Sequence, residues 1–155
     1  MTDETFEQVA RRYGDMLYRV AYHALRVRAD AEDVAQTVLL RLYQQDGGFE
    51  SEEHLKHWLL RVTVNGCKSR LRSPWRRRTA PLLETYPAAG PEEQELLEII
   101  QTLPARDRAV LHLYYYEGYR TAEIAAMTGW REGTVRSRLA RARGKLGALL
   151  KGDEP

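Results

Sequence analysis

Residues 121–145 read TAEIAAMTGWREGTVRSRLARARGK, and this stretch decides the fold expected for the chain. Ahead of Gly129, Ile124 and Met127 mark the apolar face of a short helix, for which Thr121 is a suitable N-cap. Behind Gly129, one apolar stripe of a second helix recurs at spacings of four, three and four residues: Val135, Leu139, Ala142 and Leu146. The stretch therefore predicts two helices joined by a glycine turn.

The second of these helices is strongly basic outside its apolar stripe. Glu132 is the one acid in residues 131–145, which carry the cations Arg131, Arg136, Arg138, Arg141, Arg143 and Lys145. A helix, a glycine turn and a cationic helix form the helix-turn-helix arrangement, whose second helix lies in the DNA major groove. The alternative is a solvated basic helix packed on a neighbour. The agreement of the turn, both apolar stripes and the arginine density favours DNA binding.

Charge is distributed in blocks that the total conceals. The 155 residues suit one domain or two small ones, and their net charge is only +2. Residues 54–83 hold eight basic residues and no acid, whereas residues 84–98 hold five acids and no base. The chain therefore has two separate basic regions, one on either side of an acidic segment.

The composition also bears on the cellular compartment. Cys67 is the only cysteine, which excludes an internal disulfide and fits a reducing environment. No apolar run is long enough to span a membrane, and the acidic start is not that of a signal peptide. We expect a cytoplasmic protein with no membrane insertion.

The first two helices follow from the apolar spacing of residues 6–43. A long apolar stripe runs from Phe6 to Leu25 and predicts a first helix that continues almost to Arg28. Asp30 is expected to cap a second helix. This helix is expected to bury four side chains: Val34, Val38, Leu42 and Tyr43.

A third helix is expected after the breaker at residues 46–48. Ser51 and the two glutamates behind it suit a helix start, and the helix can run to Arg72 before Pro74 ends it. Its expected stripe is Leu55, Trp58, Leu59 and Val62, which favours a core position for Trp58. No strand alternation competes in this half, so the fold class is all-α.

The remaining segments complete a two-domain plan. Residues 74–91 contain four prolines and read as a flexible linker between domains at 1–73 and 92–150. A fourth helix is expected from about residue 92, and Pro104 suits the first position of a fifth. Residues 114–116 are three tyrosines, which are expected to pack in the core and at its rim; the alternative is an aromatic protein-docking edge.

Three ordered segments resemble the extracytoplasmic-function sigma factors of bacterial RNA polymerase. DAEDVAQTVLLRLY at 30–43 is similar to the family's clamp-docking helix, and HWLLRVTVNGCKSRLR at 57–72 to its promoter-opening helix. GTVRSRLARAR at 133–143 resembles its promoter-reading helix nearly residue for residue. Three segments in order are a far more specific signal than a lone helix-turn-helix.

The resemblance implies a polymerase subunit that directs promoter-specific initiation, with site residues in three groups. Promoter opening would use Phe49, Asn65, Lys68, Ser69 and Arg72. Docking on the polymerase clamp would use Asp33, Gln36 and Arg41. The recognition helix would contact DNA through Arg131, Thr134, Arg136, Ser137, Arg138, Ala140, Arg141, Arg143 and Lys145. The implied partners are core RNA polymerase, promoter DNA and an anti-sigma factor.

Residue chemistry is consistent with these roles. Opening a duplex requires amide and aromatic groups that hold an extruded base in a positive setting, which Asn65 and Phe49 can supply. Within the recognition helix, four residues are expected to face the groove: Arg136, Ser137, Ala140 and Arg141. Arg138 and Arg143 lie on its flanks and are expected to meet phosphates, as is Lys145.

Other functions are less well supported. His54 and His57 could share a metal, but structural sites want four ligands and only Cys67 and His23 remain nearby in sequence, so no metal and no cofactor are expected. No phosphate-binding glycine loop or nucleophile elbow occurs, so no enzymatic activity is expected. A helix-turn-helix regulator that is not a polymerase subunit is the alternative function. Such a regulator needs a sensor module for which the first half leaves little room.

Overall fold

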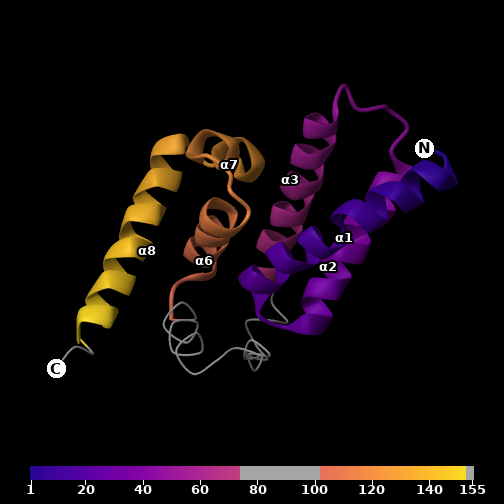
Figure 1. Ribbon diagram of the computed structural model, residues 1–155. Helices are drawn as coiled ribbons and strands as arrows, with labels where there is room; N and C mark the ends of the chain where they lie inside the picture. Colours follow the sequence, from indigo (N-terminus) through magenta and orange to yellow (C-terminus); the bar gives the residue numbers. More distant parts are fainter. Residues whose placement is uncertain (74–101, 153–155) are drawn as a thin grey trace. The chain divides into compact units, whose positions relative to one another are not determined.

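The chain divides into two compact units, Met1–Leu83 and Glu84–Pro155, in the computed structural model (Figure 1). The structure describes residues 1–73 and 102–152, with side chains up to residue 147. The expected linker at 74–91 and the expected fourth helix lie outside the described residues. Each unit is therefore treated by itself.

The N-terminal unit is built from three helices. They are α1 (Asp3–Leu25), α2 (Arg28–Gln44) and α3 (Glu52–Leu71), and each packs against the other two. The most deeply buried leucines come from all three helices: Leu17, Leu25, Leu42, Leu59 and Leu60. The apolar spacings of the sequence thus produce the expected helical bundle, and α3 ends one residue before Arg72, as the proline after it predicts.

The start of α2 differs from the expected one. Its N-cap is Val27, whose carbonyl accepts from the Ala31 N–H at 3.0 Å, because Arg26 ends α1 in the left-handed region with φ 60°. Only these two residues separate α1 from α2. Asp30 therefore lies in the first turn and not at the cap, and its carboxylate accepts from Arg70 of α3 at 3.0 Å.

Two aromatic side chains expected in the core of this unit lie nearer the surface. Tyr43 is 47% exposed, and its hydroxyl donates to Asp3 at 2.8 Å while its ring meets the edge of Phe6. Trp58 is half-buried and contacts Phe49 at 5.6 Å between ring centroids. The buried face of α3 runs instead through Leu55, Leu59, Leu60, Thr63, Val64 and Cys67. This face is rotated by about one residue, or about 100°, from the expected stripe, so that Trp58 and Val62 are only half-buried.

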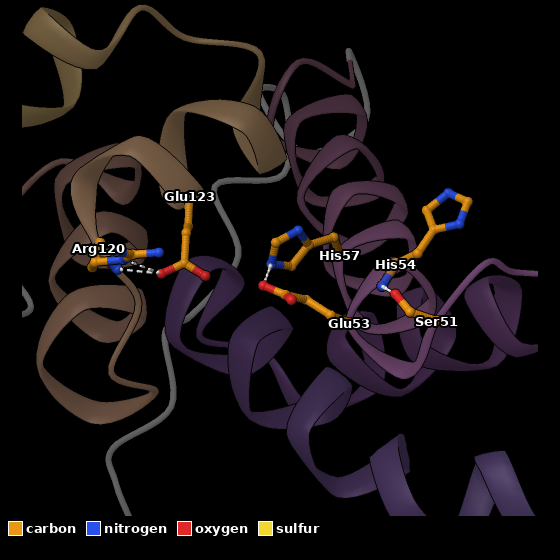
Figure 2. A network of polar contacts seen from close by, with 6 residues as sticks. All are labelled: Ser51, Glu53, His54, His57, Arg120 and Glu123. Carbon is orange, nitrogen blue, oxygen red and sulfur yellow. Dashed lines mark hydrogen bonds and ion pairs between the residues drawn. The ribbon is translucent and has the colours of Figure 1, made fainter.

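The N-terminus of α3 is held by polar contacts within the helix and with α1. The Ser51 side chain accepts from the His54 N–H at 3.0 Å, as the expected cap requires, and Glu53 lies 4.0 Å from His57 one turn on (Figure 2). Glu52 accepts from Tyr13 at 2.6 Å and pairs with Arg12, which ties α3 to α1. These two donors lower the pKa of Glu52, the Tyr13 hydrogen bond most.

The C-terminal unit contains α6 (Ala105–Leu111), the π-helix η1 (His112–Tyr116), α7 (Thr121–Thr128) and α8 (Glu132–Gly152). Its core is formed where α8 packs on α6 and α7, and it includes Val110, Leu113, Ile124, Met127, Val135, Leu139 and Ala142. Pro104 is the N-cap of α6 and not its first residue.

The helix-turn-helix is closed by polar contacts on both sides of its turn. Glu123 accepts from the backbone N–H of Arg120, the true N-cap of α7, at 3.1 Å (Figure 2). Thr121, expected as the cap, instead donates to Glu132 at the start of α8, at 3.1 Å. Gly129 ends α7 with φ 75°, and its N–H donates to Ala125 at 2.9 Å. The turn thus requires a left-handed residue.

Replacement of Gly129 by alanine should destabilise the C-terminal unit by about 1–2 kcal/mol, because an L side chain is strained in the left-handed region. Gly133→Ala is the matched control, since Gly133 lies in the first turn of α8 with open space around it. The control should leave stability unchanged or raise it by about 0.5 kcal/mol. Hydrogen exchange of α7 and α8 peptides measures both; equal protection in the two variants would contradict the role of the turn.

Candidate nucleic-acid and polymerase interfaces

The rotation of α8 about its axis is fixed by three buried side chains, Val135, Leu139 and Ala142. Successive residues of a helix are 100° apart, so the opposite face centres on Ser137, Ala140 and Arg141. The candidate recognition residues that are exposed are Arg131, Arg136, Ser137, Ala140, Arg141, Arg143 and Lys145, whereas Thr134 is half-buried. Those of them that lie in α8 are thus spread over its solvent-facing side, and Arg131 lies one residue before the helix begins.

Arg138 is not the exposed flanking residue that the sequence suggested. Its side chain is only 16% exposed; it pairs with the buried Asp107 of α6 at 3.4 Å, and its guanidinium lies 4.7 Å from the centre of the Trp130 ring. The physical reason is that position 138 lies beside the buried stripe, where a long cation can reach a carboxylate on the neighbouring helix. Arg138 therefore fastens α8 to α6.

Arg143, on the other flank of α8, is exposed but is also held. Its guanidinium lies 5.4 Å from the ring centres of both Tyr114 and Tyr115, and its Nε donates to the Tyr115 hydroxyl. The Tyr115 hydroxyl is the main cause of a raised pKa of Arg143. Nothing in the spacing of the sequence reveals this contact, which joins residues 28 positions apart.

The three consecutive tyrosines are placed by the π-helix. Tyr114 is half-buried, whereas Tyr115 and Tyr116 are 59% and 68% exposed, so of the expected core and rim positions the latter two take the rim. The Glu117 N–H returns to the His112 carbonyl at 3.0 Å, and the Glu117 carboxylate lies 3.1 Å from the His112 ring. This widened turn adds a residue to the expected α register and carries the tyrosines outward.

A groove of about 450 Å³ lies between α2 and α3 in the N-terminal unit. It is lined by two of the candidate opening residues, Asn65 and Ser69, and by Arg41 and Thr37 of α2. Phe49 is not among its lining residues; it is half-buried in the loop before α3, where its ring contacts His54 and Trp58. Arg72 is exposed beyond the end of α3, and Lys68 is half-buried.

The outer face of α2 holds two of the three candidate polymerase-binding residues. Asp33 and Gln36 are exposed and lie on the side opposite the buried Val38, whereas Arg41 lies toward the groove. The Asp33 carboxylate also accepts from Arg70 at 3.0 Å. Leu40 lies in the middle of this face and is 57% exposed, and sequence reasoning missed it. Its absence from the apolar stripe was the available signal.

The histidines weighed as metal ligands have local contacts. His54 accepts from the Glu50 N–H at 3.2 Å, and the His57 ring lies 4.0 Å from Glu53 (Figure 2). Within the described residues, no helix is long and apolar enough to cross a membrane.

Comparison with known proteins identifies the class of this protein. Residues 9–77 match the family model of sigma-70 region 2, and residues 93–146 match that of sigma-70 region 4. The ECF RNA polymerase sigma factor SigM of Mycobacterium tuberculosis (strain H37Rv) is 37% identical over 150 residues, which cover 94% of this chain and 76% of SigM. The RNA polymerase sigma-E factor of Streptomyces coelicolor is 32% identical, covering 91% and 83% of the two chains.

Solved structures agree with this result. The sigma factor RpoE of Bartonella quintana, in complex with the anti-sigma factor NepR, matches with a TM-score of 0.77 and 26% identity over 97% of this chain and 99% of that one. CnrH, in complex with the cytosolic domain of CnrY, matches with a TM-score of 0.70 and 25% identity, covering 99% and 92%. The chain belongs to the extracytoplasmic-function sigma factors, which bind core RNA polymerase and promoter DNA and direct transcription initiation.

Removal of the Arg138 charge should destabilise the C-terminal unit. Arg138→Met leaves the buried Asp107 carboxylate without its ion pair and should cost about 2–3 kcal/mol. The double variant Asp107→Leu, Arg138→Met should recover much of this loss, because an apolar pair of similar size replaces the buried ions. Hydrogen exchange of the Leu139 and Ala142 amides is the measurement. Arg136→Met, at an exposed position, is the control and should change stability by less than about 0.5 kcal/mol.

Proposed function

We propose that this sigma factor divides its work between its two units. The N-terminal domain, residues 1–73, docks on the polymerase clamp and opens the promoter; the domain at 92–150 binds the upstream promoter element, and 74–91 links them. The two family models, matched on either side of residues 78–92, support this division. The protein has no catalysis of its own and acts in the cytoplasm, where the polymerase that it serves is found.

The exposed face of α8 is the observation that carries the DNA-binding role. Ser137, Ala140 and Arg141 are exposed at the centre of this face, so they can approach base edges in a major groove. Arg131, Arg136 and Lys145 are exposed around them and can meet phosphates. Thr134 is half-buried at the edge of this face. Small residues at the centre allow close approach, and cations at the rim supply affinity.

Promoter opening is assigned to the groove between α2 and α3. The Asn65 amide has both donors and an acceptor, so it can bind the edge of an unstacked base. Ser69 lies one turn further along the same face, and Arg41 supplies a positive charge from α2. Phe49, Lys68 and Arg72 would act around the groove, through ring stacking and phosphate contacts.

Docking on the polymerase is assigned to the outer face of α2, around Asp33, Gln36 and Leu40. An exposed leucine flanked by polar residues is the composition of a small protein-binding patch, with an apolar centre and a polar rim. Arg41, at the border with the groove, can serve either surface. Because the relatives RpoE and CnrH were solved with NepR and CnrY, we also propose an anti-sigma factor that covers these surfaces until a signal arrives.

Reconstituted transcription tests the proposed function. Core RNA polymerase from the host is combined with this chain as the only sigma factor on a library of host genomic fragments. Promoter-specific starts are expected, and none should appear without the chain. Leu40→Asp is the matched control for docking, since a charge at the centre of an apolar contact should abolish binding to core polymerase while the fold is retained. Promoter-independent output would sink the proposal.

Replacement of Asn65 by alanine should impair opening more than initial binding. The exposed Asn65 lines the groove, so its loss removes hydrogen bonds to an extruded base without disturbing the core. Permanganate footprinting of holoenzyme should show fewer reactive thymines, about tenfold fewer open complexes if roughly 1.4 kcal/mol is lost, with closed-complex binding nearly unchanged. Arg61→Ala, exposed elsewhere on α3, is the control. Equal loss of binding and opening would make Asn65 merely structural.

Replacement of Arg141 by alanine should relax base preference. A bidentate arginine–guanine contact contributes about 1–3 kcal/mol of discrimination, so Arg141→Ala should weaken the cognate element and flatten the preference at one base pair. Lys145→Ala is the control; it should weaken all sequences alike and reduce the log–log salt slope by about one. Both are measured with holoenzyme on cognate and singly substituted promoters across a salt series. Uniform loss with Arg141→Ala would exclude direct readout by this residue.

A further inference from the structure

We propose that Tyr115 is a positioning residue for DNA binding, which holds Arg143 at the edge of the recognition helix for a backbone phosphate. This inference rests on the proposed DNA-binding role of α8. Tyr115 belongs to the π-helix η1 and not to the helix-turn-helix itself, and no contact with DNA is expected from its sequence position. Its importance comes from what it contacts.

The geometry around Arg143 has three parts. The Tyr115 hydroxyl accepts from Nε, and the guanidinium lies 5.4 Å from the centres of two tyrosine rings. Those rings, of Tyr114 and Tyr115, are themselves in edge contact, with centroids 4.9 Å apart and planes at 78°. Tyr114 is half-buried and anchors this aromatic corner in the unit. A long, exposed cation is thus confined from several directions.

The contact leaves the phosphate-binding end of the side chain available. Arginine carries five N–H donors, and Tyr115 occupies only the one on Nε. Within the described residues, Arg143 has no ion pair with a carboxylate, in contrast to Arg138 on the opposite flank. The four donors on the Nη atoms form the fork that matches a phosphate. A guanidinium group that is already held in place loses less conformational entropy on binding than one on a freely rotating side chain.

The position of Arg143 on α8 makes a phosphate its natural ligand. Residues 136 and 143 are 700° apart along the helix, 20° short of two full turns, so Arg136 and Arg143 form one basic edge two turns long. This edge flanks the face of Ser137, Ala140 and Arg141. Side chains at the border of a helix in the major groove reach the backbone and not the bases.

A double-mutant cycle tests the proposal in reconstituted holoenzyme, on a promoter fragment recovered from the genomic library. Tyr115→Phe keeps the ring and removes only the hydroxyl; it should weaken closed-complex binding about fivefold, the equivalent of one lost hydrogen bond. Arg143→Ala should weaken binding more and lower the log–log salt slope by about one. In the Arg143→Ala background, Tyr115→Phe should have no further effect.

The matched control is Tyr116→Phe, because Tyr116 is a neighbouring exposed tyrosine that stacks on His112 and not on Arg143. It should leave affinity unchanged, and hydrogen exchange of α8 should be the same in all variants. A full effect of Tyr115→Phe without Arg143 would overturn the positioning role, since Tyr115 would then contact DNA itself. A neutral Arg143→Ala alongside a damaging Arg141→Ala would overturn it too, with the proposed function intact. If the wild-type holoenzyme showed no promoter selectivity, the proposed function itself would be overturned.

Discussion

Burial of Val135, Leu139 and Ala142 is the constraint on which the C-terminal unit depends. These three side chains allow α8 only one rotation against α6 and α7, and that rotation decides the environment of every arginine on it. A shift of one residue would turn the helix by 100° and carry Arg136 and Arg143 from the edge onto the packed side. The apolar stripe thus also decides which cations of α8 are exposed to solvent. Gly129 supports the same outcome, because its left-handed conformation sets the direction in which α8 begins.

The arginines on the two flanks of α8, Arg138 and Arg143, are held in place by different kinds of contact. A flanking arginine on a surface helix would normally sample many rotamers, at an entropic cost when it binds. Arg138 is immobilised by a buried carboxylate and an indole ring, so its charge is largely neutralised within the fold. Arg143 is confined by tyrosines, which are neutral and leave its charge for an external anion. The chemistry of the partner, a carboxylate or a phenol, thus decides whether the charge of the arginine is neutralised within the fold or stays available.

The helices and the exposed centre of α8 could be predicted from the sequence because they depend on local spacing. Val135, Leu139 and Ala142 repeat at helical intervals, and Ser51 and Gly129 mark helix ends by chemistry that acts within a few residues. The fate of Arg138 could not be predicted, since Asp107 lies 31 positions away and only tertiary packing brings them together. The contact of Tyr115 with Arg143 could not be predicted for a second reason: the π-helix adds a residue to the turn, and an apolar pattern carries no signal for it. Leu40 shows the converse, because its absence from the apolar stripe of α2 is a local signal of its exposure.

In the N-terminal unit, a single helix, α2, contributes to the core, to the groove and to the outer surface. Its inner face packs on α1 and α3, its border with α3 lines the groove through Thr37 and Arg41, and its outer face presents Leu40. Arg70 of α3 pairs with both Asp30 and Asp33 at 3.0 Å, so the C-terminal end of α3 is tied to the first two turns of α2. A partner that docks on the outer face therefore acts on the same rigid helix that forms one wall of the groove. Because helices transmit position with little internal change, the proposed polymerase docking would fix the place at which the proposed base capture occurs.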